Sequence, residues 1–187
     1  MASQHPNYDP VSPHKIHSAE ALRQYFDQVR PMVGHEDGYF RFTFVRDPLR
    51  RFLSFYNDKI LGPARPTLFE HPSMLGLTRG LSIAECLKVM RRSGPSHKFN
   101  PHFAPQHHFL LDGPRLRVDF IGRLEQFEAG ARVVVSMSGS EANPQWLNKS
   151  GKRKKKLHIL TDAELVMFLD IYRPDYELLG YPIPTAA

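Results

Sequence analysis

Cysteine is nearly absent from the sequence, which contains one, Cys86, among 187 residues. A single thiol cannot form an internal disulfide or a cysteine-based metal site, so the composition is typical of a reducing compartment. Long apolar runs are also missing, because no stretch approaches the roughly 20 apolar residues of a membrane-spanning helix. The start, MASQHPNYDP, has neither the basic head nor the apolar middle of a signal peptide. As written, the sequence therefore indicates a cytoplasmic protein without a membrane span.

Internal repeats are missing too, since the 16 prolines and 12 glycines follow no fixed period. The apolar residues that are present, 41% of the chain, suffice for the core of one domain. We therefore expect a single domain over residues 1–187, in which residues 1–13 form an irregular arm. Lys and Arg outnumber Asp and Glu by 25 to 19, which favours an anionic partner: nucleotide phosphates, sulfated sugars, nucleic acid or anionic lipid.

Apolar periodicity and capping residues predict an alternation of helices and strands. Helices are expected at 18–30, 47–61, 82–92, 125–138 and 161–173, strands at 39–45 and 116–121, and long loops at 62–80 and 93–115. This alternation is typical of an α/β layer with a parallel sheet. Two strands are too few for a stable parallel sheet, so further strands are expected within the loops or in sequence outside this chain.

One strand-turn-helix segment, FTFVRDPLRRFLSFYNDKI, has the features of an anion site. Asp47 is a natural N-cap and Pro48 fits the first helical position, so a phosphate would meet the unpaired N–H groups and positive dipole end of a helix. Arg46 precedes this helix, and Ser54 lies about 10 Å along its axis at ~1.5 Å per residue, so the two side chains could share one anion. Alternatively, Arg46 pairs with Asp47 or Asp58, and Ser54 is an ordinary surface serine.

The same segment resembles the donor-binding motif of the carbohydrate sulfotransferases, which use 3′-phosphoadenosine 5′-phosphosulfate. The matching residues are Val45, Arg46, Asp47, Pro48, Arg51, Ser54 and Tyr56. Four further segments are similar to family motifs and follow in the family's order: 100–106, 119–125, 148–150 and 175–181. The resemblance thus covers most of the chain.

The resemblance implies a parallel sheet flanked by helices, like that of the P-loop nucleotide hydrolases. It also implies transfer of a sulfuryl group from this nucleotide donor to a hydroxyl acceptor, in the first place on a carbohydrate. Arg46 and Ser54 would bind the 3′-phosphate of the donor, with Arg51 in the same motif. Residues Asn148, Lys149 and Ser150 would form the late donor-binding loop.

The chain departs from the family pattern at its beginning. Relatives open with a phosphate-binding loop of the type P-K-x-[AG]-[GS]-[TS]-[ST], and residues 1–38 contain no such segment. We therefore expect a sheet that is incomplete at its N-terminus. Two interpretations stay open: a sulfotransferase of which this is a fragment, for which a longer N-terminus would allow a Golgi membrane location, or a non-catalytic remnant that binds nucleotide phosphate.

Sulfuryl transfer to a hydroxyl needs a base, and histidine suits that role near neutral pH. His17 and His102 are the two candidates, with carboxylates such as Glu125 as alternatives. The histidines at 97, 102, 107 and 108 lie in a proline-rich loop with no Asp or Glu between them, so we expect no metal site.

The densest run of charge, at 149–156, is typical of a solvated loop. The resemblance implies a loop over the donor instead, and a nucleic-acid-binding surface is the third interpretation. Aromatic residues are absent from the run, which weakens the case for stacking on single strands. Nucleic acid is therefore the less favoured partner, compared with the nucleotide donor.

Overall fold

A two-stranded parallel sheet joins two segments that lie far apart in the sequence. The computed structural model describes residues 40–62, 74, 76–93, 100–139 and 158–185, which belong to one compact unit, Phe40–Ala187. Strand β1 (Phe42–Val45) pairs in parallel with β4 (Phe120–Arg123). The strand predicted at 39–45 is confirmed from residue 42 onward. The predicted arm at 1–13 and helix at 18–30 lie outside the described residues, so the single domain over 1–187 stays a prediction.

Strand β4 begins later than the strand predicted at 116–121. The Asp119 carboxylate accepts hydrogen bonds from the Arg41 backbone N–H at 2.8 Å and from its guanidinium at 3.0 and 3.1 Å. The N–H of Asp119 also donates to the carbonyl of Arg41 at 2.7 Å, and the ladder starts one residue later, with Phe42 opposite Phe120. These contacts set the register, which periodicity alone could not reveal.

The segment predicted as a loop at 93–115 contains short regular elements. Helix α5 (His107–Leu110) is followed by β2 (Leu111–Asp112), which pairs antiparallel with β3 (Arg115–Leu116). Between these two strands, Gly113 has a φ of 56°, which favours glycine in the turn. Elements of two to four residues are too short to leave a periodic pattern in the sequence.

Helix α2 (Pro48–Phe55) starts where the sequence places it, directly after β1. The Asp47 side chain accepts a hydrogen bond from the N–H of Arg50 at 2.8 Å and caps the first turn. The chain then continues as a π-helical turn, η1 (Tyr56–Ile60), whose last residue is buried. Strand, turn and helix are therefore as predicted, apart from the wider final turn.

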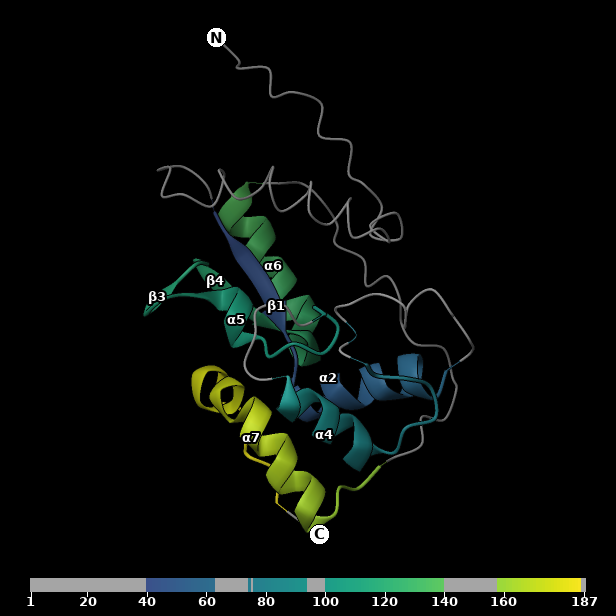
Figure 1. Cartoon of the computed structure of the whole chain (residues 1–187). Helices are drawn as coiled ribbons and strands as arrows, with labels where there is room; N and C mark the ends of the chain where they lie inside the picture. The colour runs from purple at the N-terminus through teal and green to yellow at the C-terminus, as the bar shows by residue number, and fades with distance from the viewer. Residues whose placement is uncertain (1–39, 63–73, 75, 94–99, 140–157, 186–187) are drawn as a thin grey trace. The chain divides into compact units, whose positions relative to one another are not determined.

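Helix α6 (Phe127–Ser138) runs along the sheet beside β1 and follows a short 3-10 turn, η3 (Leu124–Gln126) (Figure 1). The helix predicted at 125–138 is thus confirmed, and Gly139 ends it in a left-handed conformation. The ring of Phe44 fills the space between sheet and helix. A Cβ on Gly122 would lie 2.5 Å from this ring and one on Gly130 2.7 Å, so both positions require glycine for close packing.

Helix α4 (Ile83–Arg92) begins with a capping box. The Ser82 hydroxyl accepts from the N–H of Glu85, and the Glu85 carboxylate accepts from the N–H of Ser82. Cys86 on this helix is fully buried, and burial raises the pKa of its thiol to about 12. It is a core residue and not an activated nucleophile.

Helix α7 (Asp162–Leu179) is longer than predicted. Thr161 and Glu164 form the expected capping box, but the helix continues through Pro174 and ends at Gly180, which has a φ of 63°. The expectation that the proline would end the helix is wrong. Buried residues on both sides of the proline, Tyr172 before it and Tyr176 after it among them, hold the turn in place and outweigh the lost hydrogen bond.

The main hydrophobic core lies among α2, α4 and α7, which Figure 1 shows together below the sheet. Its fully buried members include Phe52, Leu77, Leu87, Met90, Phe103 and Phe168. In the part of the chain that the structure describes, the fold is α/β, with a small parallel sheet and flanking helices. Of the helices there, none has the length and apolar character to cross a membrane.

Candidate functional site

Arg46 lies where β1 ends and the turn into α2 begins. Its backbone N–H donates to the side-chain oxygen of Gln106 at 3.0 Å, and its carbonyl accepts from the Gln106 side-chain nitrogen at 2.7 Å. The glutamine amide therefore pairs with Arg46 as a neighbouring strand would, just beyond the last pair of the β1–β4 ladder. The carboxyl ends of parallel strands are where α/β proteins commonly bind ligands.

The backbone donors at the start of α2 are all in use. The Glu125 carboxylate accepts from the N–H of Asp47 at 3.1 Å, the Tyr176 hydroxyl from the N–H of Leu49 at 3.2 Å, and the Asp47 side chain from the N–H of Arg50. The proline between them has no N–H. The expectation that these amides await a phosphate is wrong, because acceptors from elsewhere in the chain satisfy them. An anion here would have to be bound by side chains.

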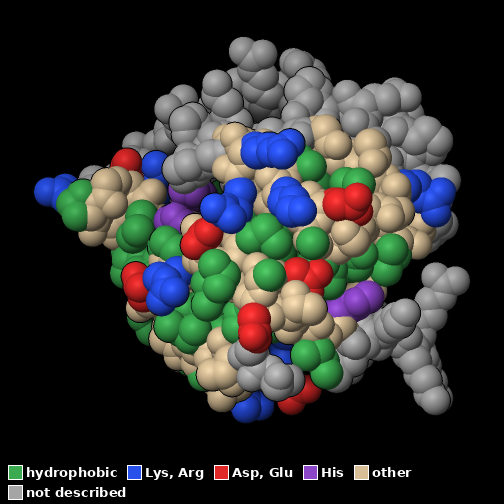
Figure 2. All heavy atoms as spheres, turned by 60° about the horizontal axis from the view of Figure 1, so that its bottom comes forward, with side chains coloured by type: hydrophobic (Ala, Val, Ile, Leu, Met, Phe, Trp, Pro, Cys, Tyr) green, Lys and Arg blue, Asp and Glu red, His purple; other side chains and the backbone are tan. Residues whose placement is uncertain are grey.

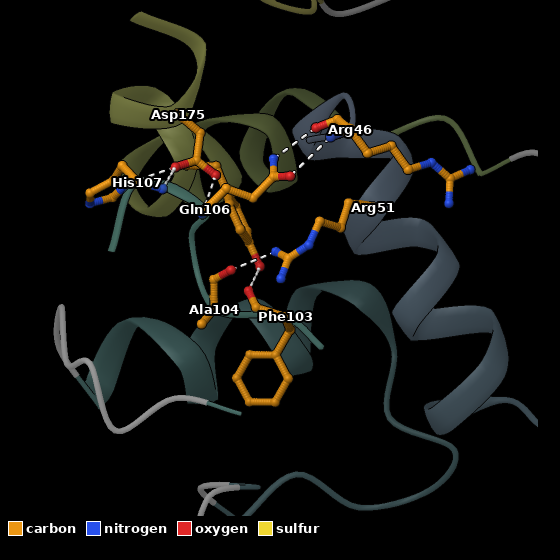
Figure 3. Close-up of polar contacts among 8 residues, drawn as sticks. Arg46, Arg51, Phe103, Ala104, Gln106, His107 and Asp175 are labelled. Atoms are coloured by element: carbon orange, nitrogen blue, oxygen red, sulfur yellow. Dashed lines mark hydrogen bonds and ion pairs between the residues drawn. The ribbon is translucent and has the colours of Figure 1, made fainter. Parts of the chain in front are cut away.

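The Arg46 guanidinium is one of two basic groups at this turn, together with that of the more exposed Arg50. The alternative that it pairs with Asp47 or Asp58 is not seen: Asp58 pairs with Lys59 at 2.8 Å, and Asp47 caps its own helix. Over the described residues, the Arg46 guanidinium makes no hydrogen bond or ion pair. Figure 3 shows this side chain directed away from Gln106, to which its own backbone is joined. Its charge is thus available for a ligand.

Glu125 stands beside this turn with its carboxylate fully engaged. One oxygen accepts from the Asp47 N–H, and the other accepts from the Tyr181 hydroxyl at 2.9 Å. Burial works to raise the pKa of Glu125, but these hydrogen bonds and the charge of Arg46 outweigh it and lower the pKa. A carboxylate with a lowered pKa and with both oxygens occupied is a poor general base.

Arg51, which the motif places with the donor ligands, is turned toward the loop that precedes α5. Its guanidinium donates to the carbonyls of Ala104 and Pro101, and Figure 3 shows it directed at this loop rather than alongside Arg46. Burial lowers the pKa of Arg51. The guanidinium therefore fastens the loop to α2, and a contact between Arg51 and a donor stays a prediction.

Ser54 is half-buried, two turns into α2. Its position on the same helix that Arg46 precedes agrees with the spacing from which the shared anion site was predicted. The described contacts do not join the two side chains, so their shared ligand also stays a prediction. His17, Asn148, Lys149 and Ser150 lie outside the described residues.

Asp175 is the residue that sequence reasoning missed. It is fully buried on α7, and its carboxylate accepts from the backbone N–H of Gln106 at 2.7 Å, the backbone N–H of His107 at 2.8 Å and the His107 ring nitrogen Nδ1 at 2.7 Å. A buried charge is tolerated where hydrogen bonds satisfy it, as here. The segment at 175–181 is similar to a family motif. Because the helix was expected to end before Pro174, the first residue of this segment was not expected to lie on a buried helical face.

His102, a candidate base, lies exposed on the same loop, with its backbone N–H bonded to the Asn100 side-chain oxygen at 3.0 Å. Its catalytic role stays a prediction. Among the described residues, no group of three or more His, Cys, Asp or Glu is arranged to hold a metal ion. Figure 2 shows basic side chains interspersed with acidic and apolar ones on the face it presents. The basic run at 149–156 lies outside the description, so its partner is untested.

Comparison with known proteins identifies the family to which the chain belongs. The chain is 28% identical over 180 residues to carbohydrate sulfotransferase 14 of Mus musculus and 27% identical over 181 residues to the Homo sapiens protein of that name. Each alignment covers 85% of this chain and 46% of the relative, so the chain spans about half the length of these relatives. No solved structure matches it. A sequence model of the sulfotransferase family matches residues 3–182, nearly the full length, and the chain therefore belongs to the sulfotransferase family.

Proposed function

We propose that this chain is part of an enzyme that transfers a sulfuryl group from 3′-phosphoadenosine 5′-phosphosulfate to a hydroxyl of a carbohydrate. Membership of the sulfotransferase family over residues 3–182 carries this proposal. The names of its relatives, carbohydrate sulfotransferases, support the acceptor class. The strands β1 and β4 would then belong to a larger parallel sheet of the P-loop nucleotide hydrolase type.

Arg46 is the central donor ligand in this proposal. Its guanidinium makes no hydrogen bond or ion pair among the described residues, and a planar guanidinium matches two oxygens of one phosphate. Because the amides at the start of α2 are already bonded, the 3′-phosphate would be bound by side chains, Arg46 and Ser54 first. Asn148, Lys149 and Ser150 would close over the donor from the late loop.

The reaction itself is a substitution at sulfur. The acceptor oxygen forms a bond to sulfur as the bond between sulfur and the phosphate oxygen breaks, and adenosine 3′,5′-bisphosphate leaves. The hydroxyl proton passes to a base, for which His102 and His17 are the candidates. Glu125 is the weaker choice, because its lowered pKa disfavours proton uptake.

Transfer is measured with donor that carries sulfur-35 and a panel of polysaccharides with free hydroxyls. The proposal predicts label in at least one polysaccharide and loss of that label with Arg46→Ala. Binding of adenosine 3′,5′-bisphosphate without transfer to any polysaccharide would instead favour a binding module. Failure of both, with salt-sensitive retention on random duplex DNA, would favour the nucleic-acid alternative.

A further inference from the structure

The backbone of Arg46 is held by residues that are distant in sequence. The β1–β4 ladder stops at Val45 opposite Arg123, so the N–H and carbonyl of Arg46 have no strand partner there. The side chain of Gln106 supplies both hydrogen bonds, at 3.0 and 2.7 Å. A planar amide that both donates to and accepts from one residue fixes the direction in which the chain leaves the strand.

Gln106 is in turn held from α7. The residue is 7% exposed, and its backbone N–H is bonded at 2.7 Å to Asp175, which is 0% exposed. The same carboxylate binds the backbone and ring of His107, so both residues at the start of α5 are joined to it. The Gln106 amide therefore projects from a backbone that a buried charge keeps in place.

The loop that carries Gln106 is fastened at its other end as well. Arg51 donates to the carbonyls of Pro101 and Ala104, and the Tyr172 hydroxyl donates to the carbonyl of Phe103. The loop is thus joined to this part of the chain at two places. Arg46 contacts it just before α2, and Arg51 contacts it from the first turn of the helix. Figure 3 shows the loop between α2 and α7, with the contact from Arg51 to Ala104 on one side.

We propose that Asp175 and Gln106 are positioning residues for Arg46, and that this chain of hydrogen bonds aims the Arg46 guanidinium at the 3′-phosphate of the nucleotide donor. The inference rests on the proposed function. An arginine side chain is long and flexible. A backbone that is already held in place therefore reduces the conformational entropy lost when the guanidinium binds a phosphate. Neither Asp175 nor Gln106 touches the ligand in this account.

The test measures how well the protein recognises the 3′-phosphate. Calorimetry gives the Kd of adenosine 3′,5′-bisphosphate and of adenosine 5′-monophosphate. The Kd of the monophosphate divided by the Kd of the bisphosphate gives a ratio that rises with the contribution of the 3′-phosphate. Gln106→Met keeps the length and neutrality of the side chain but removes both bonds to Arg46. It should reduce the ratio by about tenfold, which corresponds to the loss of roughly one hydrogen bond between the guanidinium and the phosphate. Gln106→Asn, which is one methylene too short, should behave similarly.

A double-mutant cycle shows whether the effect runs through Arg46. In an Arg46→Ala background the ratio should already be low, and Gln106→Met should reduce it no further. Val89→Ala, a half-buried position on α4, controls for general destabilisation and should leave the ratio unchanged while lowering the unfolding midpoint in urea.

Different outcomes would overturn the positioning role and the proposed donor site. A wild-type ratio near one would overturn both the donor site and the positioning role. A high ratio that Arg46→Ala lowers and neither Gln106 variant lowers would overturn only the positioning role. So would a Gln106→Met effect that is equally large with and without Arg46, since Gln106 would then act independently of the arginine.

Discussion

The helical region around α2, α4 and α7 and the sheet region around β1, β4 and α6 differ in how completely they bury their apolar residues. In the helical region Phe52, Leu87 and Phe168 are 0% exposed. In the sheet region, Phe42 on β1 is 47% exposed, and Met137 on α6 is 62% exposed. The larger cluster of buried apolar side chains among the described residues therefore lies in the helical region.

Arg46 stands at the border between these regions. It follows β1 in the sequence, yet its backbone is held by Gln106, whose own backbone is bonded to α7. A residue at the end of a small sheet thus gains its rigidity from the larger core. The backbone of Arg46 is therefore held in place by the helical region, although the sheet that it follows pairs only β1 and β4 among the described residues.

The largest expected effect comes from the buried carboxylate that links the loop to the helical region. Asp175→Ala leaves three hydrogen-bond donors without an acceptor, and we expect a loss of about 3–5 kcal/mol in the free energy of unfolding, measured in urea. Asp170→Ala on the same helix is the matched control. Asp170 is an exposed partner of Arg91 at 3.4 Å, so its loss should cost about 1 kcal/mol or less. Equal losses in the two variants would contradict the role of Asp175.

A pair of leucines compares a buried side chain of the helical region with an exposed side chain outside it, on the β2–β3 hairpin. Leu87→Ala in the helical core should lower the free energy of unfolding by about 2–5 kcal/mol, since it removes fully buried methyl groups and leaves a cavity. Leu116→Ala on the hairpin, where the side chain is 51% exposed, should change it by about 0.5 kcal/mol or less. Urea unfolding of both variants measures this difference, and a loss at Leu116 as large as at Leu87 would contradict the comparison.

The smallest effect depends on pH. The folded state lowers the pKa of Glu125, so its ionised form contributes stability above the unfolded pKa of about 4.3, and that contribution is lost as the pH falls through the lower folded value. The carboxylate is largely exposed, so the contribution should stay below about 1 kcal/mol. Unfolding of Glu125→Gln should therefore show a weaker loss of stability between about pH 5 and 3 than wild type. An unchanged pH profile would count against the hydrogen bonds at Asp47 and Tyr181.

Local signals in the sequence predicted much of this arrangement. Asp47 and Pro48 marked the start of α2, and the capping boxes at 82–85 and 161–164 marked the starts of α4 and α7. Such signals work because the residues that satisfy a helix end lie within one turn of it.

The contacts at the site could not be predicted in this way. The acceptors that occupy the N–H groups of Arg46, Asp47 and Leu49 lie 60, 78 and 127 residues away in sequence. Helix spacing made the turn look like an open anion site, and only tertiary packing shows that its amides are occupied. For the same reason the continuation of α7 through Pro174 was missed, because buried contacts on both sides of it outweigh the local preference.

In the proposed donor site, the Arg46 side chain binds the 3′-phosphate of the nucleotide. Calorimetric titration with adenosine 3′,5′-bisphosphate tests it most directly, with Arg50→Ala as the control for loss of a neighbouring exposed positive charge. We predict that Arg46→Ala weakens binding by about 10- to 150-fold, the range expected for hydrogen bonds to a charged group, and that Arg50→Ala has little effect. Equal affinity in wild type and Arg46→Ala would contradict the account.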